Sequence, residues 1–395
     1  MIPFIDLKAQ QAIIKDQLNQ RISDVLNHNH YILGPEVSEL ERQLADYCQV
    51  EHVISCASGT DALILALYAL QVKPGDVIIT TPYSFFATAE AIALVGGIPL
   101  FCDVNPDDFN LDATQLEVVI TDFYNQQQLL PKSLQQQLPD KPRVAGIITV
   151  DLFGLPCHYS AINQLAHQYN LFVIADAAQS FGASINKQKV GSLASDITTT
   201  SFFPTKPLGC YGDGGALFTN NEKLASTLRS IHLHGQGPTR AEHIQIGLNS
   251  RLDTLQAAIL LEKLTIFPQE LQQRQRIADY YQTACKHINL ATQGINTPSN
   301  ESQKQSAWAQ FTVKAKQQDQ RSAICNALKM NKIPYQIYYP IPLHLQPAFH
   351  YLGYQPGDLP MAEQLANTLF SLPMHPYLEA AVIDQIVKVI KSTSR

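Results

Sequence analysis

Lys206 and Asp176 are the two side chains whose setting in the sequence points to chemistry. Lys206 lies in TSFFPTKPLGCYGDGGA, between a hydroxyl-rich strand and a glycine-rich turn, where Pro204, Pro207 and Gly209 restrict the backbone. Asp176 ends the apolar stretch LFVIA about thirty residues earlier. An amine that forms a Schiff base and an acid that pairs with a pyridinium nitrogen are what pyridoxal phosphate (PLP) chemistry requires.

Taken alone, each of the two residues more often has an ordinary structural role. A lone lysine in a loop is usually a solvated surface charge, and an aspartate after a strand is as often the N-cap of a helix. Burial would instead lower the pKa of Lys206 and free its amine to attack an aldehyde and to carry a proton. A carboxylate after the apolar VIA is costly unless it is paired, and a protonated pyridine nitrogen would pair with Asp176.

A phosphate site is predicted where the strand HVISC, the small-residue turn ASGT and the helical DALILALYAL follow one another. Such a turn presents free backbone N–H groups and the positive end of the helix dipole to an anion. We therefore place a phosphate at Gly59 and Thr60, with the Ser201 hydroxyl as a further donor. SGT on its own more often marks a capped helix, and a serine in TTTSFF more often occupies a polar strand face.

The pyridine ring of PLP also needs an aromatic side chain to stack on it and a hydrogen bond to its phenolic oxygen. Phe85 or Phe86, in the loop TPYSFFATAE after the strand VIIT, is placed to stack on the ring, although either alone is more often a core residue. Gln179, three residues after Asp176, is placed to bind the ring oxygen.

The elements that must position these residues alternate as in an α/β protein. VAGIITVDLFG and LFVIADAAQ bracket the helical HYSAINQLAHQYN, which makes a βαβ unit and predicts a parallel sheet with Asp176 at the carboxyl end of a strand. We expect a surface helix over residues 8–30 and a Gln-rich surface insertion with one short helix over 121–143. The 395 residues are expected to divide into a large domain, 1–264, and a small C-terminal α+β domain, 265–395.

Composition argues against several classes of function. The net charge of −6, without a basic stripe, argues against a nucleic-acid partner. The seven cysteines lie far apart without a CxxC pair, which predicts reduced thiols, and neither HNH nor HLH has the further ligands that a metal needs. The start MIPFIDLKAQQ lacks a signal pattern, and the longest apolar run is too short to span a bilayer. We expect a soluble, cytoplasmic protein without a metal, membrane or nucleic-acid partner.

A set of motifs in the chain resembles one family as a whole. SGTDAL, TPYSFFATAE, DAAQSFG, SFFPTKPLGCYGDGGA, NSRLDTLQAAIL and YYPIPLH follow one another as in the DegT-type nucleotide-sugar aminotransferases, from FIDL near the start to SLPMHP near the end. The resemblance therefore covers nearly the whole chain. It implies fold type I of the PLP-dependent transferases, the aspartate-aminotransferase-like α/β fold, with a mostly parallel sheet in the large domain.

The resemblance also implies roles for the candidate residues. Lys206 would form the Schiff base with PLP. The other cofactor contacts would be Asp176 with the pyridinium, Gln179 with the ring oxygen, Phe85 with the ring face, and Gly59, Thr60 and Ser201 with the phosphate. Asn249 would reach that phosphate from a partner subunit, which implies a homodimer with shared active sites.

The substrate contacts are assigned from charge and position. Arg251, beside Asn249, is the candidate for an anionic part of the substrate. Tyr338, Tyr339 and His344, in YYPIPLH, are the other substrate-binding candidates. The family often has His-Tyr-Pro where this chain has Tyr338-Tyr339-Pro340, so a histidine expected near the sugar is replaced.

Within the family, FIDLKAQQ, SFFPTKPLGCYGDGG and SRLDTLQAAILL are most similar to enzymes that aminate C3 of a UDP-linked 2-acetamido-3-keto-hexuronic acid. This likeness implies that glutamate converts PLP to pyridoxamine phosphate, which then aminates the keto-sugar nucleotide for a surface polysaccharide such as lipopolysaccharide. Dehydratases of the family carry His in place of the lysine, so Lys206 favours transamination.

Other functions stay open at this point. The ketone could stand at C4, or the substrate could be a 3-keto-6-deoxy sugar on dTDP. From another class, the chain could be a PLP-binding sensor without turnover, although no DNA-binding segment accompanies the filled catalytic positions.

Overall fold

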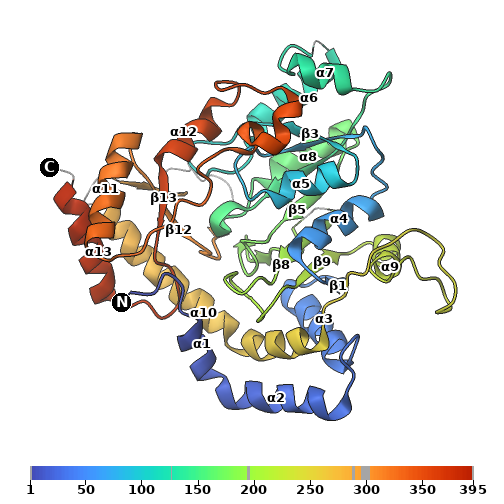
Figure 1. Ribbon diagram of the computed structural model, residues 1–395, viewed down its shortest axis with the longest axis horizontal. Helices are drawn as coiled ribbons and strands as arrows, with labels where there is room; N and C mark the ends of the chain where they lie inside the picture. The colour runs from blue at the N-terminus through green and yellow to red at the C-terminus, as the bar shows by residue number, and fades with distance from the viewer. Residues whose placement is uncertain (1, 126, 194–195, 287–289, 295–302, 394–395) are drawn as a thin grey trace.

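A seven-stranded sheet lies at the centre of the protein (Figure 1). The computed structural model describes residues 2–125, 127–193, 196–286, 290–294 and 303–393. Across the sheet the strands follow the order β1 (His52–Cys56), β9 (Gly215–Thr219), β8 (Ile197–Ser201), β5 (Phe172–Asp176), β4 (Val144–Val150), β2 (Val77–Thr80) and β3 (Ile98–Phe101). The strands from β8 to β3 pair in parallel, and β9 runs antiparallel to both β8 and β1. The predicted mostly parallel sheet is therefore confirmed.

Helices cover both faces of this sheet, which is why most of its strands are almost continuously apolar, with the hydroxyl-rich β8 as the exception. Neighbouring residues on a strand enter different cores: Ile147 and Val173 pack on one face, and Ile148 and Ile174 on the other. The first face is covered by α6 (Ala113–Asn125), α7 (Lys132–Gln137) and α8 (Tyr159–Tyr169), and the second by α4 (Gly59–Ala69), α5 (Ala87–Leu94) and α9 (Glu222–Ile231). α7 is the short helix expected within the Gln-rich insertion.

The N-terminal helices differ from the single helix expected over residues 8–30. The chain forms α1 (Leu7–Ile13) and α2 (Lys15–His28), which meet at a bend at Ile14. The Ile14 side chain is buried against Leu18 and against Ile259 on the long helix α10 (Thr254–Lys286), and this burial sets the bend. α3 (Pro35–Cys48) follows and packs on α10 as well.

The C-terminal part has its own core. A three-stranded antiparallel sheet has the order β10 (Ala291–Thr292), β12 (Phe311–Lys314) and β13 (Leu369–Leu372). It packs with α11 (Gln318–Met330), α13 (Ala380–Thr393) and the second half of α10 around Phe311, Ile324 and Ile386. The remaining elements are α12 (Pro360–Thr368), the 3-10 turns η1 (Leu152–Gly154), η2 (Leu343–Leu345) and η3 (Pro347–Leu352), and a small sheet of β11 (Lys304–Gln305), β6 (Ser184–Ile185) and β7 (Gln188–Lys189).

The helix α10 links the two parts of the protein. It runs through the expected domain boundary between residues 264 and 265, with Pro268 inside it. Its first half packs on α2 and α3, and its second half packs in the C-terminal core. The division into domains 1–264 and 265–395 stays a prediction, with α10 as a shared element. None of the described helices is long and apolar enough to cross a lipid bilayer.

Candidate active site

A pocket of about 500 Å³ opens at the carboxyl ends of the central strands, beside residues of the C-terminal part. Nine of the predicted site residues line it: Gly59, Thr60, Phe85, Asp176, Gln179, Ser201, Lys206, Tyr338 and Tyr339. Asn249, Arg251 and His344 are not among its lining residues. The fold thus brings together side chains from segments that are far apart in the sequence.

Asp176 ends β5 and is 7 % exposed. Its Oδ2 accepts a hydrogen bond from the Thr88 hydroxyl at 2.9 Å, and its Oδ1 accepts one from the backbone N–H of Ala178 at 3.1 Å. Burial raises the pKa of this carboxyl, while the two hydrogen bonds and the nearby Lys206 charge oppose the rise. A cation in the pocket would offset the cost of burial, as a pyridinium nitrogen would.

Lys206 follows β8 and reaches the same pocket as a half-buried side chain. Its backbone N–H donates to the Phe203 carbonyl at 2.9 Å, which closes the turn that carries it. Burial lowers the pKa of the Lys206 amine, and the charge of Asp176 opposes the decrease. A lowered pKa increases the fraction of free amine, which is the nucleophilic form.

The start of α4 has the geometry expected of an anion site. The Ser58 hydroxyl caps the helix by accepting the Asp61 N–H at 3.0 Å. The N–H groups of Gly59 and Thr60 lie in the first turn of the helix and so have no intrahelical partner. A Cβ on Gly59 would lie 2.6 Å from Cβ of Ser201, so glycine is needed for the close approach of the Ser201 hydroxyl. Two backbone donors, a hydroxyl and the helix dipole meet here, which fits a phosphate group.

Phe85 and Phe86 have different surroundings. Phe85 lines the pocket and is 59 % exposed, whereas Phe86 packs against Phe349 with 5.1 Å between the ring centroids. An exposed aromatic ring on a pocket wall gains burial when a flat group stacks on it. Together with the amine, the carboxylate and the anion site, Phe85 gives the pocket a matching group for each part of PLP.

Gln179 is held from two sides. Its Oε1 accepts the backbone N–H of Phe153 at 2.8 Å, and its Nε2 donates to the Tyr339 hydroxyl at 3.1 Å. The Tyr339 ring stacks on Phe153 with 6.1 Å between the centroids and 16° between the planes. A glutamine amide has two N–H donors, so the contact with Tyr339 leaves one for a ligand.

The turn at Phe153 is strained and firmly fixed. Phe153 has φ 59°, a left-handed conformation that costs energy for a residue with a Cβ. Its carbonyl accepts the Gln310 N–H at 3.3 Å. The N–H of Leu152 donates to Asn110 Oδ1 at 2.9 Å, and the carbonyl of Leu152 accepts Gln293 Nε2 at 2.9 Å. The turn that holds Gln179 is therefore anchored to the C-terminal part.

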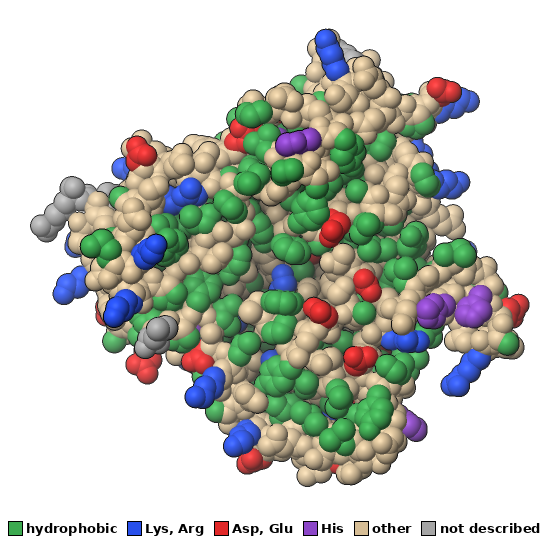
Figure 2. Space-filling model, viewed as in Figure 1, with side chains coloured by type: hydrophobic (Ala, Val, Ile, Leu, Met, Phe, Trp, Pro, Cys, Tyr) green, Lys and Arg blue, Asp and Glu red, His purple; other side chains and the backbone are tan. Residues whose placement is uncertain are grey.

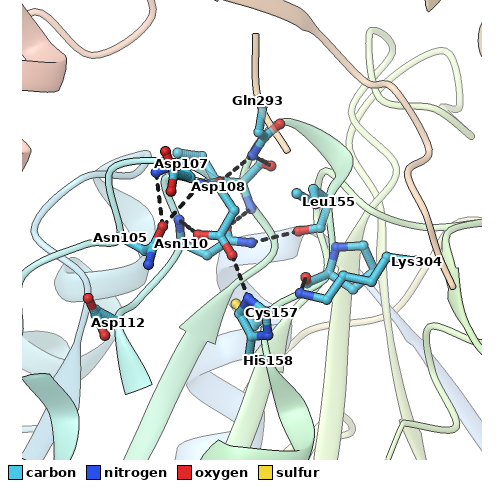
Figure 3. A network of polar contacts seen from close by, with 12 residues as sticks. Asn105, Asp107, Asp108, Asn110, Asp112, Leu155, Cys157, His158, Gln293 and Lys304 are labelled. Carbon is cyan, nitrogen blue, oxygen red and sulfur yellow. Dashed lines mark hydrogen bonds and ion pairs between the residues drawn. The ribbon is translucent and has the colours of Figure 1, made fainter. Parts of the chain in front are cut away.

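Figure 3 shows the polar network behind this turn. Gln293 Nε2 also donates to the Asp108 carbonyl at 2.7 Å, and the N–H of Asn110 donates to Asp108 Oδ1 at 3.0 Å. His158 Nε2 lies 2.9 Å from Oδ2 of Asp108, which is fully buried. The network joins the loop after β3, the end of β4 and the C-terminal part beside the pocket.

Thr88, Phe153 and Gln310 were not predicted from the sequence. Thr88 fixes Asp176, Phe153 fixes Gln179, and Gln310 lines the pocket beside Tyr338. A polar Thr88 within the apolar helix of TPYSFFATAE is the one local signal among them.

His344 does not lie where a substrate contact was expected. The residue is fully buried, and its Nε2 lies 3.2 Å from Oε1 of Glu363. Its ring packs edge-on against Phe101 and Tyr354, and burial lowers its pKa while Glu363 opposes the decrease. We therefore leave His344 out of the proposed substrate site.

Asn249 and Arg251 lie where an arm of residues 232–250 returns to the body of the protein. Figures 1 and 2 show this arm projecting beside α9. Ile244 on the arm is 61 % exposed and Ile246 is 92 % exposed.

The described residues include no group of three or more His, Cys, Asp or Glu side chains that could hold a metal ion.

Comparison with known proteins connects this chain with one family. The model of the DegT/DnrJ/EryC1/StrS aminotransferase family matches residues 12–391. A UDP-2-acetamido-2-deoxy-3-oxo-D-glucuronate aminotransferase from Pseudomonas aeruginosa is 46 % identical over 383 residues, which cover 97 % of this chain and 98 % of the relative. A UDP-N-acetyl-3-dehydro-α-D-glucosamine 3-aminotransferase from Acidithiobacillus ferrooxidans is 38 % identical over 99 % of this chain and 98 % of the relative.

Two crystal structures have the same fold. An aminotransferase of this family from Brucella abortus is 44 % identical, with a TM-score of 0.90 and coverage of 99 % of each chain. NtdA from Bacillus subtilis, solved with bound cofactor PMP, is 28 % identical, with a TM-score of 0.82 and coverage of 98 % of this chain and 83 % of that one. The fold class predicted from the sequence is therefore confirmed.

Proposed function

Because the chain belongs to the DegT/DnrJ/EryC1/StrS aminotransferase family, we propose that it transfers an amino group from glutamate to C3 of a UDP-linked 2-acetamido-3-keto-hexuronic acid. The protein is a PLP-dependent nucleotide-sugar aminotransferase, which confirms the reaction class and the cofactor predicted from the sequence. One observation carries the choice of sugar: the 46 % identity over 97 % of the chain to an enzyme named for that uronate.

We propose that Lys206 and Asp176 divide the chemistry between them. PLP, when bound, supplies an electrophilic carbon and an electron sink. Lys206 Nζ would take the proton from the donor carbon that loses nitrogen and, in the second half-reaction, give a proton to the sugar carbon that gains nitrogen; its lowered pKa and half-buried position suit it for both. Asp176 keeps a negative charge opposite the ring nitrogen, held in place by Thr88 and the Ala178 N–H.

The other predicted contacts bind and orient the cofactor in this proposal. The phosphate is bound by the N–H groups of Gly59 and Thr60 and by the Ser201 hydroxyl, which meet at the start of α4. Phe85 covers one face of the ring, and Gln179 donates to the ring oxygen with its second amide N–H.

The charge of the pocket bears on whether it can bind an acidic sugar. Among the described residues that line it, Lys206 is the single cation, and the wall on the side of the C-terminal part is formed by Tyr338, Tyr339 and Gln310. A uronate carboxylate therefore needs a positive charge from elsewhere. We propose that Arg251 of the partner subunit supplies it, with Asn249 of the partner subunit at the phosphate.

A homodimer is part of this proposal. The arm of residues 232–250 supports it, because Ile246 and Ile244 are exposed on a projecting segment next to Asn249 and Arg251. A second copy that covers these side chains would bring both polar residues near the other pocket.

An uncharged sugar is the second candidate. The wall formed by Tyr338, Tyr339 and Gln310 is neutral, and Tyr338 stands where the family often has His. The 38 % identity to the UDP-N-acetyl-3-dehydro-α-D-glucosamine enzyme also favours a sugar with a hydroxymethyl group at C5 in place of the carboxylate.

The experiment compares keto-sugar nucleotides with the PLP-loaded protein. Glutamate and each of four candidates are supplied: the UDP-linked 3-keto-uronate, its hydroxymethyl analogue, a 4-keto sugar and a dTDP-linked 3-keto-6-deoxy sugar. Release of 2-oxoglutarate is followed, with Lys206→Ala as the inactive control. We expect the highest kcat/KM for the uronate, and Arg251→Gln should lower it about tenfold or more without affecting the neutral analogue.

The other outcomes are equally informative. A preference for the hydroxymethyl sugar, for the 4-keto sugar or for the dTDP sugar would overturn the proposed substrate and leave the reaction class intact. A protein that binds PLP and aminates none of the four, with any of several amino-acid donors, would support the sensor.

We further propose that the reaction takes place in the cytoplasm and supplies an amino sugar for a surface polysaccharide such as lipopolysaccharide. All seven cysteines are buried and unpaired, as suits a reducing compartment.

A further inference from the structure

Lys263 on α10 is a buried charge that the proposed reaction does not use. Only 1 % of the residue is exposed. Its Nζ donates a hydrogen bond to the Gly209 carbonyl at 2.6 Å and lies 4.2 Å from the centre of the Tyr211 ring. Its recorded partners in the described part of the chain are thus a carbonyl and an aromatic ring. Burying an ammonium group without a carboxylate beside it is costly, so its surroundings must compensate.

The groups that face Lys263 account for its charge state. Burial lowers its pKa to about 8, and the charge of Glu270, on the same helix, opposes the decrease. Cys210 and Tyr211 are the titratable residues that face it from the loop. Because a pKa of about 8 leaves the amine mainly protonated at neutral pH, Gly209 receives a charge-assisted hydrogen bond.

Gly209 belongs to the loop that carries Lys206. The N–H of Lys206 donates to the Phe203 carbonyl at 2.9 Å, and a Cβ on Gly209 would lie 2.6 Å from that same carbonyl oxygen. The backbone of Gly209 therefore passes so close to the Phe203 carbonyl that a residue with a Cβ would not fit there.

α10 holds this loop at a second point. Gln256 Oε1 accepts the backbone N–H of Tyr211 at 2.9 Å. One helix therefore binds a carbonyl of the loop through Lys263 and an N–H of the loop through Gln256.

We propose that Lys263 is a positioning residue that, together with Gln256, fixes the loop on which Lys206 meets PLP. This inference rests on the proposed role of Lys206. It assigns to Lys263 no contact with PLP or with the substrate.

A second lysine in the protein provides a matched control. Lys189 Nζ donates to the Gly182 carbonyl at 3.3 Å and lies 5.2 Å from the centre of the Tyr47 ring. Lys189 thus has the same kinds of partner as Lys263, a glycine carbonyl and a tyrosine ring. It lies outside the loop that carries Lys206. Its replacement therefore measures how much stability is lost with such a lysine when the loop itself is untouched.

The experiment compares Lys263→Met, Lys263→Gln, Gln256→Leu and Lys189→Met with the wild type. The readouts are the equilibrium constant for PLP release, the pH midpoint of the visible absorbance of the bound cofactor, and the thermal unfolding temperature. We expect Lys263→Met to weaken PLP binding about tenfold and to shift the pH midpoint. Gln256→Leu should act in the same direction, and Lys263→Gln, which keeps an N–H donor, should restore part of the loss.

The spectroscopic readouts separate positioning from a purely structural role. Lys189→Met should keep the wild-type PLP affinity and pH midpoint even if its unfolding temperature falls. If Lys263→Met or Lys263→Gln unfolds at a lower temperature while both spectroscopic values stay at wild type, the inference is wrong. Should Lys263→Met not fold, Gln256→Leu and Lys263→Gln decide the question by the same criterion. Lys206→Ala is measured in parallel: visible absorbance retained in that variant would contradict the role of Lys206 on which the inference rests, whereas unchanged spectroscopic values in the Lys263 variants would contradict the role of Lys263 alone.

Discussion

Oε1 of Gln179 accepts the backbone N–H of Phe153 at 2.8 Å, so the predicted contact of the cofactor ring also holds a strained turn. The other end of the same amide donates to Tyr339, whose ring stacks on Phe153. One side chain therefore joins the loop after β5, the turn at the end of β4 and the aromatic wall on the substrate side. A substitution in any one of these three segments should therefore alter the position of the other two.

Gln179→Leu should destabilise the protein even without PLP. The buried N–H of Phe153 loses its acceptor, and an unpaired buried donor costs about 1–3 kcal/mol. Tyr339→Phe is the matched control, because it removes one hydroxyl and leaves that N–H paired, with an expected cost of about 0.5–1.5 kcal/mol. Urea unfolding of the PLP-free proteins measures both values. Equal losses in the two variants would show that the bond to Phe153 contributes little.

Asp176→Asn should make the PLP-free protein more stable at neutral pH. Burial raises the pKa of Asp176 above 3.8, so the folded state binds this proton more tightly than the unfolded state. The free energy of unfolding therefore falls as the pH rises from 3.8 through the raised pKa. Asparagine does not ionise, so this decrease should be absent in Asp176→Asn.

Thermal unfolding at pH 4 and pH 7 checks this expectation, with the exposed Asp140→Asn as control. The difference in unfolding temperature between Asp176→Asn and the wild type should become smaller toward pH 4. Added PLP should reverse the order at pH 7, since a ligand stabilises the state that binds it. An advantage that persists in PLP would contradict the pairing of Asp176 with the cofactor.

The stability difference between the wild type and Lys263→Met should depend on pH. The folded pKa of Lys263 is about 8 and the ordinary value is 10.5, so the unfolded state binds more protons between these two values. The free energy of unfolding of the wild type, relative to that of Lys263→Met, should therefore rise by up to about 1.4 kcal/mol per pH unit from pH 8 upward. Below pH 8 the lysine is charged in both states and the cost of burial is fully present.

Urea unfolding at pH 7, 8.5 and 10 measures this difference. Titration of groups away from Lys263 cancels because both proteins share them, whereas Cys210, whose pKa the Lys263 charge lowers, titrates differently in the two proteins. A difference that stays constant over this range would mean that Lys263 keeps an ordinary pKa in the folded protein.

Ile246→Asp should weaken the proposed dimer while leaving the fold of the single chain intact. The side chain is 92 % exposed, so its replacement should change the stability of the chain by less than about 0.5 kcal/mol. Sedimentation of the variant should show dissociation at concentrations where the wild type is a dimer. Met330→Asp, at a residue 84 % exposed on α11, is the control that should sediment as the wild type does. A monomeric Ile246→Asp with full activity would remove Asn249 and Arg251 from the shared site.

The residues that could be predicted from the sequence each have a local signal. Asp176 ends an apolar strand, Lys206 lies among Pro and Gly, and Gly59 stands between a strand and a helix. The βαβ pattern likewise predicted the parallel strands. In each case the physical cause lies within a few residues of the position itself.

The residues that could not be predicted depend on contacts across the chain. Nothing in LLEKL distinguishes a buried Lys263 from a surface lysine, and Gln293 reaches Leu152 from a distant segment. His344 stands in the motif YYPIPLH, but a motif does not tell which way a side chain turns, and its ring faces Glu363. The bend at Ile14 has the same origin, since it depends on burial against Ile259.

The spacing of Gln256 and Lys263 on α10 limits how this protein can change during evolution. The two residues are seven positions apart, which is close to two helical turns, so both side chains lie on the face toward the loop of Lys206. Insertion or deletion of one residue between them would rotate one contact away by about 100°. This stretch of α10 can therefore accept substitutions but not a change of length.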